Sequence, residues 1–234
     1  MATALEIHPL LGIGEVRPGD DVASVLLPAI EAVGPARGDV LVVTHKIVSK
    51  AEGAVRKIVG DEEEFKTALV EEIARSVVRR RGNLIIAETK HGFVCANAGV
   101  DRSNAAPGTM ILLPDDPDRS AHRIRSKLAQ RTGVDFPVII SDTFGRPWRR
   151  GLTDIAIGIS GLLPILDLVG TTDWSGRDLD VTQIAVADEL AAAADLVMGK
   201  ASGTPAALVR GYDGPLGEGR ASELIRPVDE DLFR

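Results

Sequence analysis

Short apolar runs, which are typical of buried strands, alternate with amphipathic stretches along the chain. The segment DVLVVTHKIVSK (39–50) predicts a buried strand that turns polar at Thr44. Further strands are predicted at 83–89, 92–99, 109–114 and 136–143, in the apolar segment 153–170, and at 206–212. The sequence TKHG between the first two of these has the composition of a hairpin connection, so we expect them to be neighbours.

Three stretches show helical periodicity instead. Residues 62–81 carry acidic side chains in the first turn and arginines in the last, as the helix dipole favours. Residues 116–133 begin with Asp116 and Pro117 and stop at Gly133, which are typical helix boundaries. The third stretch, 181–200, is rich in alanine, and we expect it to approach a sheet or another helix closely.

The predicted helices and strands do not follow the strict alternation of a doubly wound sheet. Their order favours an α+β fold with mixed or antiparallel sheets and packed helices. With 234 residues the chain is long enough to bury a substantial core. We expect a single domain, residues 1–234, built from two intimately associated subdomains.

Composition narrows the possible functions. Apolar residues make up 44% of the chain and aromatic residues 3%, so the core must be aliphatic. The net charge of −7 argues against a general affinity for nucleic acid, which requires Lys and Arg to neutralise phosphates. Cys95 is the only cysteine, which excludes an internal disulfide and favours a reducing compartment.

Nothing in the sequence predicts a membrane segment. No basic region followed by an apolar one opens the chain, and no apolar run approaches the roughly 18–20 residues that cross a bilayer. We therefore expect a soluble, cytoplasmic protein that binds neither nucleic acid nor membranes.

Polar or glycine-rich residues follow apolar strand material in four places. These are GIGEVRPGDD (12–21), VVTHKIVSKAEG (42–53), CANAGVDRSN (95–104) and IISDTFGRPWRRG (139–151). Asp101 and Asp142 each come directly after such a run, and Thr143 adds a hydroxyl. Carboxylate and hydroxyl oxygens suit Mg²⁺ or Mn²⁺, although for each Asp taken alone a turn cap is the commoner role.

Other residues in these stretches suit an anionic ligand. Backbone amides near Gly99 and the Asn104 side chain could cradle a phosphate or a base edge, or could form a simple Asx turn. Lys46 and Lys50 follow a buried strand and could meet a phosphate, or could be solvated. No Walker A motif and no G-x-G-x-x-G after a strand is present, so any nucleotide must bind in another way.

The sequence does not favour a zinc site or a cysteine nucleophile. The histidines, at 8, 45, 91 and 122, lack the spacing of a zinc site. Cys95 lies among small apolar residues, which favours a buried and inert thiol over a nucleophile. Arg146, Arg149 and Arg150 offer guanidinium groups that match carboxylates or phosphates, unless this segment is an ordinary surface turn.

The four stretches resemble the coenzyme F420-0:L-glutamate ligase family, the γ-glutamyl ligases. The resemblance covers residues from about 5 to the end of the chain. It depends on RPGDD, VSKAEG, NAGVDRSN, SDTFGRPWRRG and VADELAAAADLVMGK, which occur in one order and spacing. It implies the α+β fold of that family, a homodimer, and a stand-alone ligase domain.

The resemblance also implies substrates and site residues. GTP and a divalent cation, Mg²⁺ or Mn²⁺, would serve the addition of L-glutamate to coenzyme F420-0 through a γ-linked amide, and K⁺ is a further candidate cofactor. Three residues fall on metal positions of the family: Asp101, Asp142 and Thr143. Guanine-nucleotide positions correspond to Ile13, Gly14, Glu15, Val16, His45, Lys50 and Asn104. Lys200 stands where some members carry an acidic residue that helps the metal, and here it would meet the phosphates as a cation.

A mechanism follows as a hypothesis. The metal would offset charge during transfer of the γ-phosphoryl group of GTP to the substrate carboxylate. The amine of glutamate would then attack the acyl phosphate, while Arg146, Arg149 or Arg150 holds an acidic substrate. Two alternatives remain at this stage: a non-catalytic module that binds a nucleotide or deazaflavin, and a ligase of the same fold that acts on another carboxylate.

Overall fold

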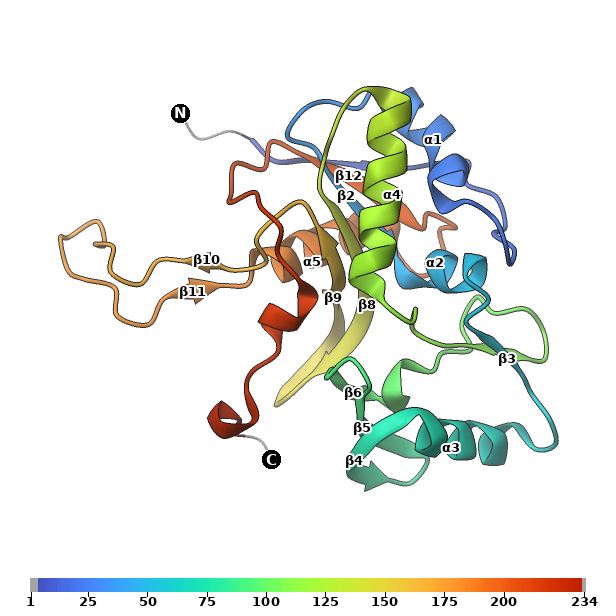
Figure 1. Cartoon of the computed structure of the whole chain (residues 1–234). Helices are drawn as coiled ribbons and strands as arrows, with labels where there is room; N and C mark the ends of the chain where they lie inside the picture. Colours follow the sequence, from blue (N-terminus) through green and yellow to red (C-terminus); the bar gives the residue numbers. More distant parts are fainter. Residues whose placement is uncertain (1–3, 233–234) are drawn as a thin grey trace.

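The computed structural model describes residues 4–232, and its largest element is a five-stranded sheet (Figure 1). The strand order is β1 (Glu6–Pro9), β12 (Ala206–Arg210), β2 (Val40–Thr44), β8 (Val138–Arg146) and β9 (Arg149–Ser160). The pairing of β2 with β8 is parallel, and the other three pairings are antiparallel. The sheet is therefore mixed, as the sequence predicts.

Helices cover both faces of this sheet, with α4 (Pro117–Thr132) in front of it and α5 (Val186–Met198) behind it in the view of Figure 1. A further helix, α1 (Val22–Val33), packs against α4. Gly158 on β9 allows α4 to lie close to the sheet, because a side chain there would come within 2.6 Å of the backbone of Pro117 at the start of α4. The large hydrophobic core lies between these layers and is mostly aliphatic, although Phe93, Phe136 and Phe144 are also buried in it.

The predicted boundaries of α4 are confirmed. The Asp116 side chain accepts a hydrogen bond from the Arg119 amide at 3.0 Å, and Gly133 ends the helix in the left-handed region at φ 72°. The close packing predicted for the alanine-rich segment is also confirmed, since Ala187, Ala191 and Ala194 on α5 are fully buried.

A second, smaller hydrophobic cluster lies in the lower part of Figure 1. Here α3 (Glu62–Ile73) packs on a three-stranded sheet of β4 (Ala74–Arg81), β5 (Leu84–Thr89) and β6 (Val94–Ala96). The pair β3 (Val55–Lys57) and β7 (Thr109–Ile111) and the short helix α2 (His45–Ala51) connect this cluster to the main sheet. Smaller elements complete the chain: η1 (Asn97–Gly99), β10 (Leu166–Asp167), β11 (Gln183–Ile184), η2 (Ala221–Leu224) and η3 (Val228–Glu230).

Several predicted boundaries were wrong. The strand predicted in the segment 39–50 ends at Thr44, and the residues after it form helix α2. The helix predicted for 62–81 ends at Ile73, and its arginine-rich half pairs with β5 as the edge strand β4. The helix predicted for 181–200 begins only at Val186, because 183–184 pair with β10. Helix α1 and strand β1 were not predicted.

The strand predicted for 136–143 does not end at Asp142 and Thr143. In the structure β8 continues to Arg146, and with β9 it forms a two-stranded ribbon that extends from the sheet at the lower left of Figure 1. Among residues 4–232, no helix has the length and apolar character needed to cross a membrane.

Candidate active site

A cavity of about 310 Å³ opens beside α2, and we call it the α2 cavity. Its wall includes nearly all of the residues assigned to nucleotide binding by resemblance: Ile13, Gly14, Glu15, Val16, Lys50, Asn104 and Lys200. These residues come from four separate parts of the sequence. The fold therefore brings together in one place the groups that the sequence only suggested were related.

Basic side chains and glycines characterise this cavity. Lys46 and Lys50 reach it from α2, and Lys200 follows the C-terminus of α5 in a segment that contains Gly199 and Gly203. The Lys50 ammonium lies 2.6 Å from a Glu15 carboxylate oxygen, so this lysine is held across the cavity mouth. Three ammonium groups around one cavity suit a ligand with several phosphates.

His45 is the one predicted nucleotide residue outside the cavity wall. It is fully buried at the start of α2, where its Nδ1 lies 3.2 Å from the Ser49 hydroxyl. Its Nε2 lies 3.2 Å from Asp142 Oδ1, but the geometry is not that of a hydrogen bond, so this buried nitrogen has no aligned partner. His45 therefore faces Asp142 on β8 and not the space of the α2 cavity.

The three predicted metal ligands each contact a basic side chain. The Lys46 ammonium lies 2.7 Å from an Asp101 carboxylate oxygen, and His45 lies beside Asp142. Lys200 donates a hydrogen bond to the Thr143 hydroxyl. Each of these oxygen donors is thus already in contact with a basic group of the protein.

Asp101 combines a turn with this charge contact. Its carboxylate accepts hydrogen bonds from the amide and hydroxyl of Ser103, both at 2.7 Å, which is the Asx turn that the sequence allowed. Burial acts to raise the pKa of Asp101, but the Lys46 ammonium and the Ser103 donors outweigh it and leave that pKa below its usual value. The group is therefore charged at neutral pH and able to hold a cation.

Asp154 is a site residue that was not predicted. It lies opposite Thr143 in the pairing of β8 with β9, and its carboxylate accepts hydrogen bonds from Thr143 at 2.6 Å and from Ser141 at 2.9 Å. The Lys200 ammonium lies 3.1 Å from the same carboxylate, which also lines the α2 cavity. The role of Asp154 could be predicted only from the register in which 136–143 pairs with 153–160. That register depends on the turn between the two strands, and the sequence motifs do not define this turn.

The metal prediction fits the donor chemistry of this region. Carboxylates and a hydroxyl are ligands that hard divalent cations prefer, and the unaligned Nε2 of His45 marks a polar position beside Asp142 that is not fully satisfied. Among residues 4–232, no group of three or more His, Cys, Asp or Glu side chains forms a ready metal cage. A cation bound by Asp101, Asp142 and Thr143 would therefore need ligands from a bound phosphate or water as well, as Mg²⁺ commonly takes.

The arginines lie apart from these residues. Arg146 ends β8 and Arg149 begins β9, so both lie at the exposed tip of the ribbon, where Arg146 donates to the carbonyl of Arg150 at 3.0 Å. None of the three lines the α2 cavity. Within the described chain they are positioned to meet an acidic group that approaches from outside.

Cys95 has the properties predicted for an inert thiol. It is buried in the main core, and burial, with a smaller contribution from the Asp142 charge, raises its pKa to about 12. A thiol with that pKa is almost entirely protonated at neutral pH, so it is a poor nucleophile.

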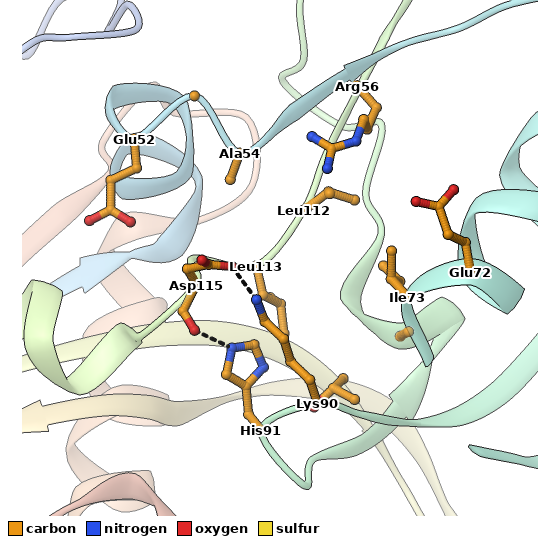
Figure 2. Close-up of a pocket in the computed structure, with 13 residues that line it drawn as sticks. Glu52, Ala54, Arg56, Glu72, Ile73, Lys90, His91, Leu112, Leu113 and Asp115 are labelled. Atoms are coloured by element: carbon orange, nitrogen blue, oxygen red, sulfur yellow. Dashed lines mark hydrogen bonds and ion pairs between the residues drawn. The ribbon is translucent and has the colours of Figure 1, made fainter. Parts of the chain in front are cut away.

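A second cavity, of about 520 Å³, lies where the two hydrophobic clusters meet, and we call it the junction cavity (Figure 2). Its wall is formed by the end of α2, strand β3, the end of α3, the β5–β6 turn, η1 and the segment after β7. Leu113, part of the main core, and Leu112, part of the smaller cluster, both line it. None of the predicted site residues belongs to this cavity.

Comparison with known proteins gives a consistent result. A model of the F420-0:Gamma-glutamyl ligase family matches residues 11–211. The chain is 44% identical to a coenzyme F420:L-glutamate ligase of Methanopyrus kandleri over 98% of both chains. It is 43% identical to that of Methanothermobacter thermautotrophicus, over 95% of this chain and 96% of the relative, and 44% identical to that of Methanocaldococcus jannaschii, over 84% and 85%. The range matched by the family contains every residue that lines the α2 cavity.

Proposed function

The chain belongs to the F420-0:gamma-glutamyl ligase family and is a ligase, and from this premise we propose how it acts. It adds L-glutamate to coenzyme F420-0, and to the product F420-1, through γ-linked amide bonds. GTP supplies the energy through an acyl phosphate. Mg²⁺ or Mn²⁺ assists, with K⁺ as a further candidate, and the enzyme works as a cytoplasmic homodimer.

One observation carries this proposal. Six residues assigned to the guanine nucleotide by resemblance line a single cavity, together with Lys200, Lys46 and the buried carboxylate of Asp154. A nucleotide in the α2 cavity would place its phosphates among Lys46, Lys50 and Lys200, each of which now contacts a carboxylate of the protein. Glu15 is exposed, so Lys50 can exchange this contact for a phosphate without leaving a buried charge. The buried carboxylate of Asp154 would keep the hydroxyls of Ser141 and Thr143 if Lys200 turned to a phosphate.

The chemistry follows from the poor reactivity of a carboxylate. Transfer of the γ-phosphoryl group of GTP to a substrate carboxylate oxygen breaks the β–γ bond, releases GDP and gives an acyl phosphate. The amine of glutamate then attacks the acyl carbon, loses a proton, and expels inorganic phosphate as the amide forms. The lysines of the α2 cavity would hold the phosphates in line and offset their charge in both steps.

Asp101, Asp142 and Thr143 would hold the divalent cation, and the cation would supply stabilisation of the negative charge that develops on the phosphates. Asp154 would orient Thr143, because the threonine hydroxyl donates to it at 2.6 Å. The exposed arginines at the ribbon tip would meet the acidic tail of the coenzyme or the glutamate carboxylates.

The test is a reconstitution with defined substrates. The protein is incubated with F420-0, GTP, Mn²⁺ and L-glutamate, and the products are analysed by mass spectrometry for added glutamyl units and by phosphate release. We expect glutamylated product and GDP only when all four components are present. GTP that is bound but never hydrolysed would instead support a non-catalytic binding module. Product from a different carboxylate, with F420-0 left unmodified, would assign another substrate to the same fold.

A further inference from the structure

The junction cavity contains several charged side chains, and most of them are already neutralised. The Lys90 ammonium pairs with the Asp115 carboxylate, and Figure 2 shows this contact at the floor of the cavity. The Glu52 carboxylate pairs with Arg123 and also accepts a hydrogen bond from Ser120. The negative charges of Asp115 and Glu52 are therefore already balanced by basic side chains of the protein, so neither carboxylate is expected to bind a charged ligand.

His91 also contributes no charge. Its Nε2 lies 3.0 Å from the carbonyl oxygen of Pro114 and 3.1 Å from that of Asp115, so Nε2 must carry the proton and donate it. Burial is the main influence on the pKa of this imidazole and lowers it, so the ring is neutral at pH 7. The ring stacks on Phe93 at a centroid distance of 5.7 Å and forms a flat part of the wall.

Two charged groups of the cavity remain unpaired. Arg56 on β3 and Glu72 in the last turn of α3 form no ion pair with any residue between 4 and 232. The guanidinium of Arg56 makes only a 3.4 Å contact with the carbonyl of Val55. The Glu72 carboxylate stands at the negative end of a helix, where a cation is favoured. Figure 2 shows both side chains extending from different walls toward the same space.

We propose that the junction cavity binds a small molecule that carries a carboxylate and an ammonium group, an α-amino acid, with Arg56 holding the carboxylate and Glu72 holding the ammonium. The cavity volume of about 520 Å³ is in the usual range for a small-molecule site and exceeds what one amino acid needs. Ile73, Leu112 and Leu113 provide an apolar surface for the methylene groups of the ligand. The inference rests on the proposed function in one respect: L-glutamate is the amino acid that a ligase of this family would take.

The backbone supports a functional role for this wall. Asn97 and Ala98 both adopt the left-handed conformation, at φ 52° and 50°, which residues other than glycine adopt only at a cost in free energy. Ala98 lines the cavity, and Asp101 follows three residues later, at most about 10 Å along the chain. The strained turn thus links the wall of the junction cavity directly to a predicted metal ligand.

A second connection passes through aromatic rings. Phe93, which stacks on His91, contacts Phe144 edge-on at 6.3 Å, and Phe144 follows Thr143 on β8. Two short connections therefore link the wall of the junction cavity to residues next to the predicted metal ligands.

The experiment is calorimetric titration of L-glutamate into the intact protein, without and with GDP and F420-0, together with steady-state kinetics. The variants are Arg56→Gln and Glu72→Gln. Two adjacent residues provide matched controls on the same elements: Lys57→Gln and Glu71→Gln, neither of which lines the cavity. We expect at least tenfold weaker binding of L-glutamate, and at least a tenfold higher KM for glutamate, in the cavity variants, with less than twofold change in the controls and in the KM for GTP.

The outcomes separate this inference from the proposed function. If the unmodified protein glutamylates F420-0 while both cavity variants bind and use L-glutamate normally, the assignment of the cavity is wrong and the function stands. If glutamate binding needs Arg56 and Glu72 but no product forms with any carboxylate, the cavity is an amino-acid site and the proposed GTP-dependent reaction is wrong. Glutarate, which lacks the ammonium, should bind at least tenfold more weakly than L-glutamate. Equal binding of glutarate, or no binding of L-glutamate under either condition, would also overturn the assignment.

Discussion

At the scale of single residues, Asp154 shows how charge is arranged in the site. Its carboxylate is 3% exposed and receives the hydroxyls of Ser141 and Thr143 and the ammonium of Lys200. A buried carboxylate is tolerated only when its oxygens are satisfied in this way. Nothing in the local sequence TDIAIG distinguishes Asp154 from a strand-end Asp, and its role emerges only from the residues opposite it on β8.

We therefore predict that Asp154→Asn weakens catalysis more than it weakens folding. Asparagine keeps the size of the side chain but removes the charge that holds Lys200, so Lys200 and Thr143 lose their fixed positions. Turnover should fall roughly 10–100-fold, since each factor of ten corresponds to about 1.4 kcal/mol in the barrier. Steady-state kinetics with GTP and F420-0 measure this, with the exposed Asp167→Asn on β10 as control. Equal turnover in both variants would reduce Asp154 to a structural residue.

A second residue-scale prediction concerns acid stability. The Arg125 guanidinium holds Asp135 through two hydrogen bonds, at 2.8 and 2.7 Å, and this lowers the pKa of Asp135 below its usual 3.8 despite an opposing effect of burial. The stabilisation is present above the unfolded pKa and is lost as pH falls through the lower folded pKa. Because the Asp135 side chain is 58% exposed, it should amount to less than about 1 kcal/mol.

Asp135→Asn should accordingly lower the free energy of unfolding at pH 7 by up to that amount and make no difference near pH 2. Urea unfolding at both pH values provides the measurement, with Asp213→Asn as the control, since Asp213 is exposed and forms no ion pair with any residue between 4 and 232. A difference between Asp135→Asn and the unmodified protein that is as large at pH 2 as at pH 7 would show that the pair acts through packing and not through charge.

At the scale of elements, the sequence predicted the bounds of a helix correctly where capping residues mark both of its ends. Helix α4 has an Asp cap and a left-handed Gly, and both were readable in the sequence. Helix α3 lacks such a stop, and the eight residues after Ile73 have a charged pattern that helix or strand could satisfy. Their pairing with β5 decides the outcome, because a non-local partner overrides a weak local preference. For the same reason the seven residues of α2, directly after a buried strand, could not be separated from it.

Helix α5 gives a prediction at this scale. Ala191 is fully buried in the main core, so Ala191→Leu should overpack the contact with the sheet and lower the free energy of unfolding by about 1–3 kcal/mol. Because Lys200 follows the end of α5, the same change should raise the KM for GTP. Thermal unfolding and kinetics test both effects, and Ala193→Leu, a half-buried position on the same helix, is the control. If the two variants behave alike, close packing of α5 does not position Lys200.

At the scale of the whole molecule, the fold class followed from the order of elements, but the two cavities did not. The α2 cavity is built from residues near positions 15, 50, 104 and 200, and the motifs could group them only through the family resemblance. The junction cavity includes Glu52, Gly53 and Ala98 from two of the motifs, but its two unpaired charges, Arg56 and Glu72, belong to none of them. A site formed by unpaired charges on separate elements cannot be predicted from the sequence, because only the structure shows which charged side chains already form ion pairs.

The surface leads to the last prediction, that the chain forms a homodimer. Large apolar side chains are exposed on two projecting hairpins, with Leu152 on the β8–β9 ribbon 69% exposed and Trp174 and Val181 beside β10 and β11 93% and 87% exposed. Burying such groups against a second copy of the chain is favourable by about 25 cal/mol per Å² of apolar surface.

Sedimentation equilibrium should therefore give twice the mass of the chain, and Leu152→Asp should shift the equilibrium toward monomer. Val59 is 73% exposed in the loop before α3, and Val59→Asp should leave the equilibrium unchanged. An active protein that sediments as a monomer at all concentrations would contradict the dimer. A dimer unaffected by Leu152→Asp would place the interface elsewhere and leave the ribbon, with its three arginines, free to contact substrate.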